Sequence, residues 1–281
     1  MKLHRDTAEI FVPDGLSPAQ ALRRTTHLAV SAHQDDIEIM AASPILECFQ
    51  RSDRWFTGVV VTDGSGSPRN GVYEQYDDEQ MRLVRFKEQH KAAIVGEYAA
   101  LIMLDYPSRE VKGSSMLPVD DLAAILKASR PQAVYTHNLA DKHDTHVAVA
   151  LKVIAAIRSL PKNARPQKLF GCEVWRGLDW LVDDDKVAFD LSRQGNLQAA
   201  LLGVFDSQIS GGKRYDQASL ARRQANATYF ESHGVDTTTS MSFGMDMTAL
   251  ILEDGKEPLA FIQEYIQRFN QEVIDRLKRV S

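Results

Sequence analysis

The chain has 281 residues, of which 44% are hydrophobic and 25% are charged, and its formal net charge is −5. This composition is typical of a globular enzyme, and the acidic balance excludes a nucleic-acid backbone as the main partner, because such binding needs a concentrated basic surface. No apolar run reaches the length of about 18 residues that a membrane span needs. The N-terminus lacks the apolar segment of a secretory signal, and Cys48 and Cys172 form no CxxC pair, so we expect a cytoplasmic protein with reduced thiols.

The first 174 residues alternate between strand-like and helix-like segments. The sequence predicts strands at 27–32, 55–62, 100–104, 133–136 and 168–174, and helices at 37–50, 78–98, 119–129 and 146–158. This order predicts an α/β fold with a doubly wound, mostly parallel, Rossmann-like sheet that has helices on both faces. Pro44 is expected to kink the first of these helices. The loop from Asp63 to Tyr76 is long for its position, which favours a functional role.

The C-terminal portion is less regular. We expect helices at 197–208 and 219–232, a strand at 240–251 and a closing helix at 258–279. The segment Gly211–Tyr215 fits either a mobile loop or a phosphate-binding nest, and we favour the loop. Asp183, Asp184 and Asp185 are expected to form a solvated turn.

Polar side chains follow four of the predicted strands, at the edge of a doubly wound sheet where ligands bind. The first strand runs into His33-Gln34-Asp35-Asp36, the second and third end at Asp63 and Asp105, and the fourth precedes His137, Asp141, His143, Asp144 and His146. Imidazole and carboxylate together suit zinc with three protein ligands and one open position for water. An aspartate here could instead cap the next helix, and the later histidines could be solvated. Their coincidence at matching strand ends favours a metal site.

Two of these segments resemble the motifs of a known family. Ala32-His33-Gln34-Asp35-Asp36-Ile37-Glu38 resembles the AHPDDE signature of the LmbE/PIG-L-type N-acetylglucosaminyl deacetylases, and His143-Asp144-Thr145-His146 resembles their HPDH motif. Thr62-Asp63-Gly64, Arg85-Phe86-Lys87-Glu88 and Gly96 also match the loop and helix of that family. The resemblance covers residues 25–160 well and the rest only in outline.

The resemblance implies a zinc-dependent hydrolase that removes an N-acetyl group, with an amino sugar or glycoside as the expected substrate. His33, Asp36 and His146 correspond to the ligands of Zn²⁺, for which another divalent transition metal is the alternative. Asp35 corresponds to the general base, and His143 to a histidine that assists the intermediate or the leaving amine. Arg85 corresponds to an arginine that contacts the substrate. From their places at strand ends, Asp63 and Asp105 are also expected to contact the substrate, and Arg176, outside the resemblance, is expected to give support together with Asp144.

The motifs depart from the family at three positions. Gln34 replaces a proline, which should loosen the turn without removing a ligand. The acidic residue of the first motif sits one place later, at Glu38. In the second motif Asp144 stands two residues before the ligand histidine, where the family has its aspartate one residue before.

Three other functions remain to be weighed. A nucleotide-binding Rossmann protein would show G-x-G-x-x-G after the first strand, where this chain has two carboxylates that would repel a pyrophosphate. A metal-dependent hydrolase of a non-sugar amide or ester stays open, as does a catalytically silent ligand-binding member. We expect one domain over 1–281, with a catalytic core at 25–160 and an extension at 161–281 that shapes the substrate pocket. The expected partner is a small N-acetylated molecule, without nucleic acid or membrane, and homo-oligomerisation stays open.

Overall fold

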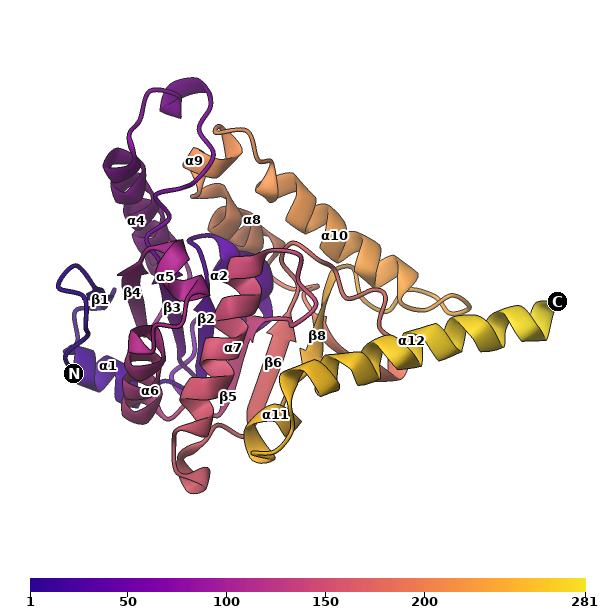
Figure 1. Ribbon diagram of the computed structural model, residues 1–281. Helices are drawn as coiled ribbons and strands as arrows, with labels where there is room; N and C mark the ends of the chain where they lie inside the picture. The colour runs from indigo at the N-terminus through magenta and orange to yellow at the C-terminus, as the bar shows by residue number, and fades with distance from the viewer.

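The computed structural model describes residues 1–281 and contains one eight-stranded sheet in the order β1-β4-β3-β2-β5-β6-β8-β7 (Figure 1). The strands are β1 (Glu9–Phe11), β2 (His27–Ser31), β3 (Phe56–Thr62), β4 (Ala100–Tyr106), β5 (Ala133–His137), β6 (Lys168–Cys172), β7 (Lys186–Asp190) and β8 (Met241–Asp246). Strands β2 to β6 pair in parallel, whereas β1, β7 and β8 pair antiparallel at the two sides. The predicted α/β class and mostly parallel sheet are confirmed.

Helices connect the parallel strands and continue into the C-terminal part. They are α1 (Pro18–Arg23), α2 (Asp36–Met40), α3 (Ala42–Cys48), α4 (Asp78–Val95), α5 (Ser108–Lys112), α6 (Leu117–Ser129), α7 (Asp144–Arg158), α8 (Gly195–Gly203), α9 (Asp206–Ile209), α10 (Tyr215–Tyr229), α11 (Ala249–Leu252) and α12 (Pro258–Val280). Short 3₁₀ turns lie at Gly71–Tyr73, Lys162–Ala164 and Asp183–Asp185. None of the helices combines the length and the apolarity that crossing a membrane would require.

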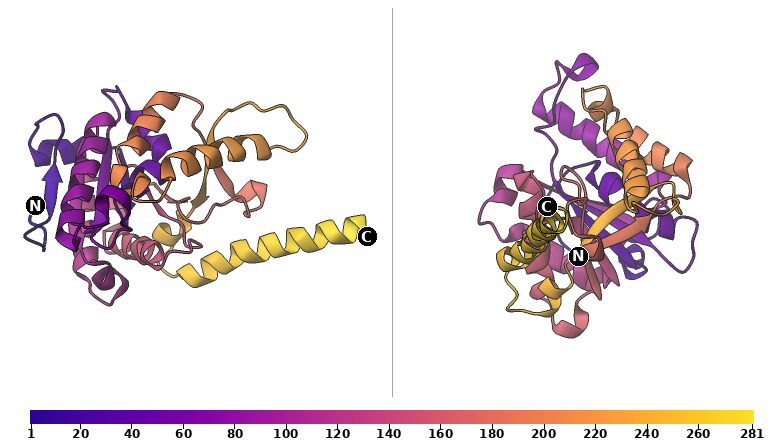
Figure 2. Two further views of the ribbon diagram at one scale, coloured as in Figure 1. Left: turned by 90° about the horizontal axis from the view of Figure 1, so that it is seen from above. Right: turned by 90° about the vertical axis from the view of Figure 1, so that its right-hand side faces the viewer.

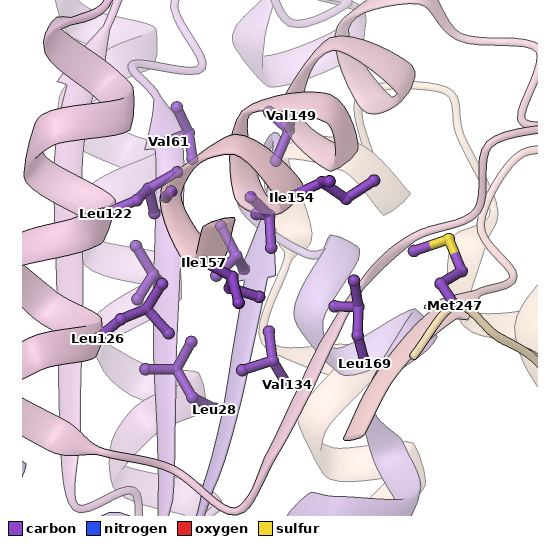
Figure 3. Packing of buried hydrophobic residues seen from close by; sticks show 14 of the residues in the cluster. Leu28, Val61, Leu122, Leu126, Val134, Val149, Ile154, Ile157, Leu169 and Met247 are labelled. Atoms are coloured by element: carbon purple, nitrogen blue, oxygen red, sulfur yellow. The ribbon is translucent and has the colours of Figure 1, made fainter. Parts of the chain in front are cut away.

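Buried side chains cover both faces of the sheet. On one face Leu126 of α6 and Ile157 of α7 pack with Leu28 of β2 and Val134 of β5 (Figure 3). The opposite face is covered by α2, α4 and α8, whose buried side chains, such as Ile37, join a second apolar cluster. Each large aliphatic side chain buried in this way contributes about 1.5–3 kcal/mol. These two layers hold the parallel strands fixed and align their carboxyl ends at one edge.

The helix predicted at 37–50 is divided into α2 and α3. The chain breaks at Ala41, where φ is −115°, three residues before Pro44. Proline has no N–H to donate, and its ring would clash with the carbonyl of Met40, four residues earlier. The interruption therefore falls before the proline instead of at it.

Other boundaries also differ from the sequence expectations. The strand predicted at 240–251 ends at Asp246 and is followed by α11, and the helix predicted at 197–208 is divided into α8 and α9. The sequence analysis missed β1, α1, α5 and β7, which are all short or lie at the sides of the sheet. Asp183–Asp185 is the expected polar turn, and Asp185 pairs with Arg268 of α12 at 2.6 Å.

The last helix leaves the body of the molecule. Figures 1 and 2 show α12 running outward, with its C-terminal half extending past the sheet and its covering helices. Phe261, near its first turn, is its only buried residue.

Candidate active site

Three potential metal ligands meet at the carboxyl ends of β2 and β5. The two strands are parallel neighbours, so the segments that follow them lie side by side. His33 Nδ1 lies 3.2 Å from Asp36 Oδ2 and 3.2 Å from His146 Nε2, and the last two atoms are 3.3 Å apart. Ligands at about 2.0–2.1 Å from a tetrahedral zinc ion are separated by about 3.3 Å. The three donor atoms therefore fit a metal of this kind.

The electrostatics of this triangle favour a bound positive charge. Burial alone would raise the pKa of Asp36, but the imidazoles of His146 and His33 hold it well below its usual value. Burial likewise opposes a charged His146, yet the carboxylates of Asp36 and Asp141 raise its pKa to about 9. This donor set attracts a positive charge, which a proton or a divalent cation can supply.

Two more histidines adjoin the triangle. The buried ring of His137 stacks on that of His146 with centroids 3.9 Å apart, but its Nε2 already accepts a hydrogen bond from the N–H of Ala32 at 2.8 Å. The ring of His143 lies 4.6 Å from that of His146 and lines the adjacent cavity. Burial lowers the pKa of His143, so its imidazole is neutral near neutral pH. His137 is committed to the fold, whereas His143 is available for chemistry.

A buried carboxylate stands behind His146. Asp141 Oδ2 lies 3.5 Å from His146 Nδ1, and the carboxylate of Asp141 accepts hydrogen bonds from the backbone N–H groups of His143, Trp175 and Arg176. A carboxylate in this position fixes the orientation of a metal-binding histidine. The sequence analysis placed Asp141 in the polar cluster after the fourth strand, as a possible partner of His143, but did not pair it with His146, five residues later. Asp144, which was expected to give support, is instead exposed in the first turn of α7.

Asp35 occupies a strained turn next to the triangle. Its φ is +85°, a conformation that costs a non-glycine residue about 1–3 kcal/mol. Its N–H donates to Gln89 Oε1 at 3.2 Å, and Gln89 Nε2 donates to Glu38 Oε1 at 2.8 Å. Glu38, one place later than in the family motif, thus supports the turn through Gln89. Burial raises the pKa of Asp35, as befits a base that must take up a proton.

The fully buried guanidinium of Arg85 closes one side of the site. Its Nη2 donates to the carbonyl oxygen of Gln34 and lies 3.3 Å from Asp35 Oδ2, and its Nη1 is 3.9 Å from Glu88 Oε2. Nε and Nη1 of Arg85 have no hydrogen-bond partner, and the residue lines the cavity. Arg85 therefore has donor capacity that no protein group uses.

The residue that replaces the family's proline is buried. Gln34 Nε2 donates to the carbonyl oxygen of Thr62 at 3.2 Å. Gly64, with φ +70°, lies so close that a Cβ atom there would be 2.2 Å from Gln34 Oε1. Gln34 therefore joins the first motif to the end of β3 and the loop after it.

A cavity of about 560 Å³ opens above these groups. Side chains from the two motifs, from the loop after β3 and from the C-terminal part surround it. Its lining consists of His33, Asp35, Asp36, Gly64, Gly66, Ser67, Pro68, Arg85, Ser108, Lys112, His143, Thr145, Trp175, Gln208, Lys213 and Tyr215. The rings of Trp175 and Tyr215 meet edge to face, with centroids 6.1 Å apart.

Residues 28–157 match the family model described as PIG-L: GlcNAc-PI de-N-acetylase. The match covers 130 of the 281 residues. The matched segment runs from β2 to the end of α7 and contains His33, Asp35, Asp36 and His146. No curated protein sequence matches the chain.

Several solved structures have a similar fold. The N,N'-diacetylchitobiose deacetylase from Pyrococcus horikoshii is 16% identical with a TM-score of 0.64, over 80% of this chain and 85% of that one. GalB, the 4-carboxy-2-hydroxymuconate hydratase from Pseudomonas putida, is 15% identical with a TM-score of 0.62, over 79% and 96%. A conserved protein from Thermus thermophilus is 17% identical with a TM-score of 0.60, over 79% and 94%. At these identities the likeness establishes a shared fold alone. The names of the two enzymes, a deacetylase and a hydratase, describe different reactions.

Three residues that were expected to contact or support the substrate lie outside the cavity. Asp63 Oδ1 accepts hydrogen bonds from the N–H and hydroxyl of Ser65, both at 3.0 Å. Asp105 forms a bidentate pair with Arg82 at 2.8 and 2.7 Å. The side chain of Arg176 is exposed, and its neighbour Trp175 lines the cavity instead. Position at a strand end was the sequence signal for Asp105 and Arg176, and Asp63 also matched the loop of the family. Neither signal specifies where a side chain points.

Proposed function

We propose that this chain is a metal-dependent N-deacetylase that hydrolyses the N-acetyl group of a small molecule. Zinc is the expected metal, with another divalent transition metal as the alternative, and an amino sugar or glycoside is the substrate class that the family suggests. The observation that carries the proposal is the triangle of His33, Asp36 and His146 donor atoms beside the buried carboxylate of Asp35, inside the segment that matches the PIG-L family model.

The proposed reaction is the hydrolysis of an amide. The donors of His33, Asp36 and His146 would hold the metal, which when bound lowers the pKa of water from 15.7 toward about 7 and polarises a carbonyl. Asp35 takes the proton of the attacking water, whose oxygen bonds to the acetyl carbon. The C–N bond then breaks, and the proton passes to the nitrogen, so that acetate and a free amine leave.

Arg85 and His143 are placed to act on the charges that develop in this reaction. The free N–H groups of Arg85 can donate to the acetyl oxygen as it becomes negative, and a preorganised donor of this kind is typically worth ~10²–10³ in rate. His143, beside His146 on the cavity wall, can donate a hydrogen bond to the same oxygen and, in its protonated form, a proton to the amine.

A non-sugar amide or ester is the second candidate substrate. Asp63 and Asp105, expected to contact a sugar, are engaged by Ser65 and Arg82. The cavity then presents no carboxylate beyond Asp35 and Asp36 to bind sugar hydroxyls. The hydratase name of GalB indicates that a similar fold carries a different reaction, so an assay decides the bond that is cleaved.

The C-terminal extension is proposed to shape the pocket within a single domain. Trp175, Gln208, Lys213 and Tyr215 come from 161–281 and line the cavity beside the catalytic-core residues of 25–160. Strands β6, β7 and β8 continue the same sheet. A cytoplasmic location stays a prediction from the sequence.

The test is metal analysis of the purified full chain, combined with an acetate-release screen over N-acetylated amino sugars, N-acetylated amino acids and acetyl esters. We expect about one zinc or other divalent transition metal per chain, and acetate release that the Asp35→Asn variant lacks. A chain that binds no metal, or a fully metal-loaded chain that releases acetate from none of these compounds, would contradict the proposal.

A further inference from the structure

The charges of the cavity are divided between floor and rim. Asp35 and Asp36 are its only lining carboxylates, and both lie at the floor with the metal-ligand triangle and Arg85. Lys112 and Lys213 line it as well, from α5 and from the turn before α10. Whereas the neighbouring Arg214 pairs with Asp216 at 2.8 Å, these two lysines form no ion pair. Their ammonium groups are free to meet a bound molecule.

The backbone that carries Lys213 is held firmly. Its N–H donates to the carbonyl oxygen of Gln208 at 2.7 Å. A Cβ atom at Gly211 would lie 1.9 Å from the carbonyl oxygen of Ser207, so the close turn requires glycine. The ammonium of Lys213 lies 5.0 Å from the ring centroid of Trp175, and that of Lys142 lies 5.6 Å from it. Positive charge thus gathers around the aromatic wall of the cavity.

We infer that the substrate is an anion: an N-acyl compound that carries a carboxylate or phosphate at the end remote from its acyl group. This inference rests on the proposed function, because it assumes that the acyl group is bound at the cavity floor. An anionic group at the rim satisfies Lys112 and Lys213 by charge-assisted hydrogen bonds, which are stronger than neutral ones. A neutral substrate would leave the half-buried ammonium of Lys213 with only the ring of Trp175 beside it, and would gain nothing from the exposed ammonium of Lys112.

The test compares matched neutral and anionic substrates. The pairs are N-acetylglucosamine with its 6-phosphate, and N-acetylalaninamide with N-acetylalanine. We expect the anionic member of at least one pair to have the higher kcat/KM. The double variant Lys112→Ala with Lys213→Ala should raise the KM for the anionic substrate about tenfold, because it loses charged hydrogen bonds at the rim. Its kcat should stay within about twofold of the wild type, because the groups at the cavity floor are unchanged. Lys127→Ala, on the exposed surface of α6, is the matched control.

Product binding separates this inference from the proposed function. Calorimetry with glucosamine 6-phosphate and glucosamine, and with alanine and alaninamide, requires no turnover. If no compound releases acetate but the anionic products bind more tightly and lose this preference in the double variant, the anion inference stands and the proposed reaction fails. If acetate is released but neither kinetics nor binding favours the anions, the proposed reaction stands and the inference is overturned.

A second, independent feature is the apolar stripe of α12. Its members recur every three or four residues: Leu259, Ile262, Ile266, Phe269, Val273, Leu277 and Val280. Ile266, Leu277 and Val280 are 50%, 61% and 76% exposed. Figure 2 shows that the helix continues beyond the body, and an unsupported helical segment of this length is marginally stable in water. Ile262 packs against the core and the ring of Phe269 meets that of Trp180 edge to face at 6.2 Å, so the stripe lacks a partner only over its C-terminal part.

We propose that a second copy of this chain covers the stripe as an antiparallel helix pair. The three–four spacing is that of a coiled-coil seam. A two-fold axis at Val273 places Ile266 opposite Val280 and Phe269 opposite Leu277, whereas parallel pairing would set Arg276 against the partner's Arg276. Charge argues against a membrane surface, which favours a strongly basic polar face. The cations and anions of α12 are nearly balanced: Arg268, Arg276, Lys278 and Arg279 against Glu264, Glu272 and Asp275.

Light scattering coupled to size-exclusion chromatography tests this pairing. The full chain should be a dimer. Val273→Glu combined with Leu277→Glu should give a monomer whose near-ultraviolet circular-dichroism spectrum matches that of the wild type, which shows that the sheet and its covering helices remain folded. Gln267→Glu, outside the stripe, should leave the dimer intact. A monomeric wild type, a dimer that survives the double substitution, or co-sedimentation with phosphatidylcholine–phosphatidylserine vesicles would overturn the proposal.

Discussion

Asp35 and Asp36 are adjacent and both buried, yet their surroundings differ. Asp36 faces the imidazoles of His33 and His146, which hold its pKa well below the usual value and keep it available to a cation. Asp35 faces Arg85, but burial outweighs that positive charge and raises its pKa. A pair of carboxylates whose pKa values are pushed apart by their environments can divide the tasks of ligand and base.

Asp35→Asn tests that division. The amide retains the size of the side chain but cannot accept a proton, so we expect a metal content equal to that of the wild type and a kcat lower by ~10²–10⁴. Elemental analysis and acetate release measure the two quantities. Asp36→Asn is the matched comparison, and it should lose the metal because three ligands leave no redundancy. Near-normal turnover of Asp35→Asn would remove this residue from the base role.

His143→Ala distinguishes a catalytic histidine from a ligand. The rings of His33, His143 and His146 also lie close enough to form an alternative three-histidine metal site. We expect the variant to retain metal and to lose ~10²-fold in kcat, with a smaller change in KM. Asp144→Asn, at an exposed position, should behave like the wild type. Loss of metal in His143→Ala would favour the three-histidine site instead.

The elements around the site differ in how far the sequence predicts them. Strand β2 and the first motif were predictable, because an apolar run ends directly at the ligand residues. The helix at 78–98 was also predictable, but the contacts by which it supports the site were not. Gln89 and Arg85 reach Asp35 across about 50 positions of sequence, and no local pattern encodes such a contact. Asp141, rather than Asp144, stands behind His146, and this local contact depends on the backbone path of the loop between them, which the spacing of the two residues does not reveal.

Asp105→Asn tests the role of the β4 end. Asp105 is buried and pairs with Arg82 of α4, so its loss should destabilise the packing of α4 on the sheet by about 2 kcal/mol. Asparagine tolerates the φ of +60° at this position, which isolates the effect of the lost charge. Chemical denaturation measures the free energy of unfolding.

Glu79→Gln is the control for Asp105→Asn. Glu79 also pairs with Arg82, at 2.9 Å, but Glu79 is exposed, so this substitution should change the free energy of unfolding by less than about 1 kcal/mol. If Asp105→Asn leaves stability unchanged and raises KM for substrate, Asp105 binds substrate as the sequence analysis expected.

At the scale of the whole molecule, the C-terminal part is joined to the core through buried polar contacts. Glu88 of α4 accepts hydrogen bonds from the N–H and hydroxyl of Ser207, both at 2.6 Å. Arg223 of α10 donates to the carbonyl oxygens of Glu38 and Ile39 at 2.8 and 3.1 Å. These contacts join residues more than 100 positions apart, which explains why the irregular C-terminal third could be outlined but not placed from its sequence. They connect α9 and α10, which contribute Gln208 and Tyr215 to the cavity lining, to α4 and α2 of the core.

Removal of the metal should therefore affect the stability of the entire fold. A ligand that binds only the native state stabilises it by about 4 kcal/mol at a free concentration 1,000 times its Kd. For a chain of this size we expect chelation to lower the Tm by about 10 °C. Differential scanning calorimetry before and after dialysis against a chelator measures the shift, and zinc added back should restore it. His33→Ala, which lacks one member of the donor triangle, should show no response to either treatment. An unchanged Tm in the wild type, with loss of its metal verified by elemental analysis, would show that the metal does not contribute to the stability of the fold.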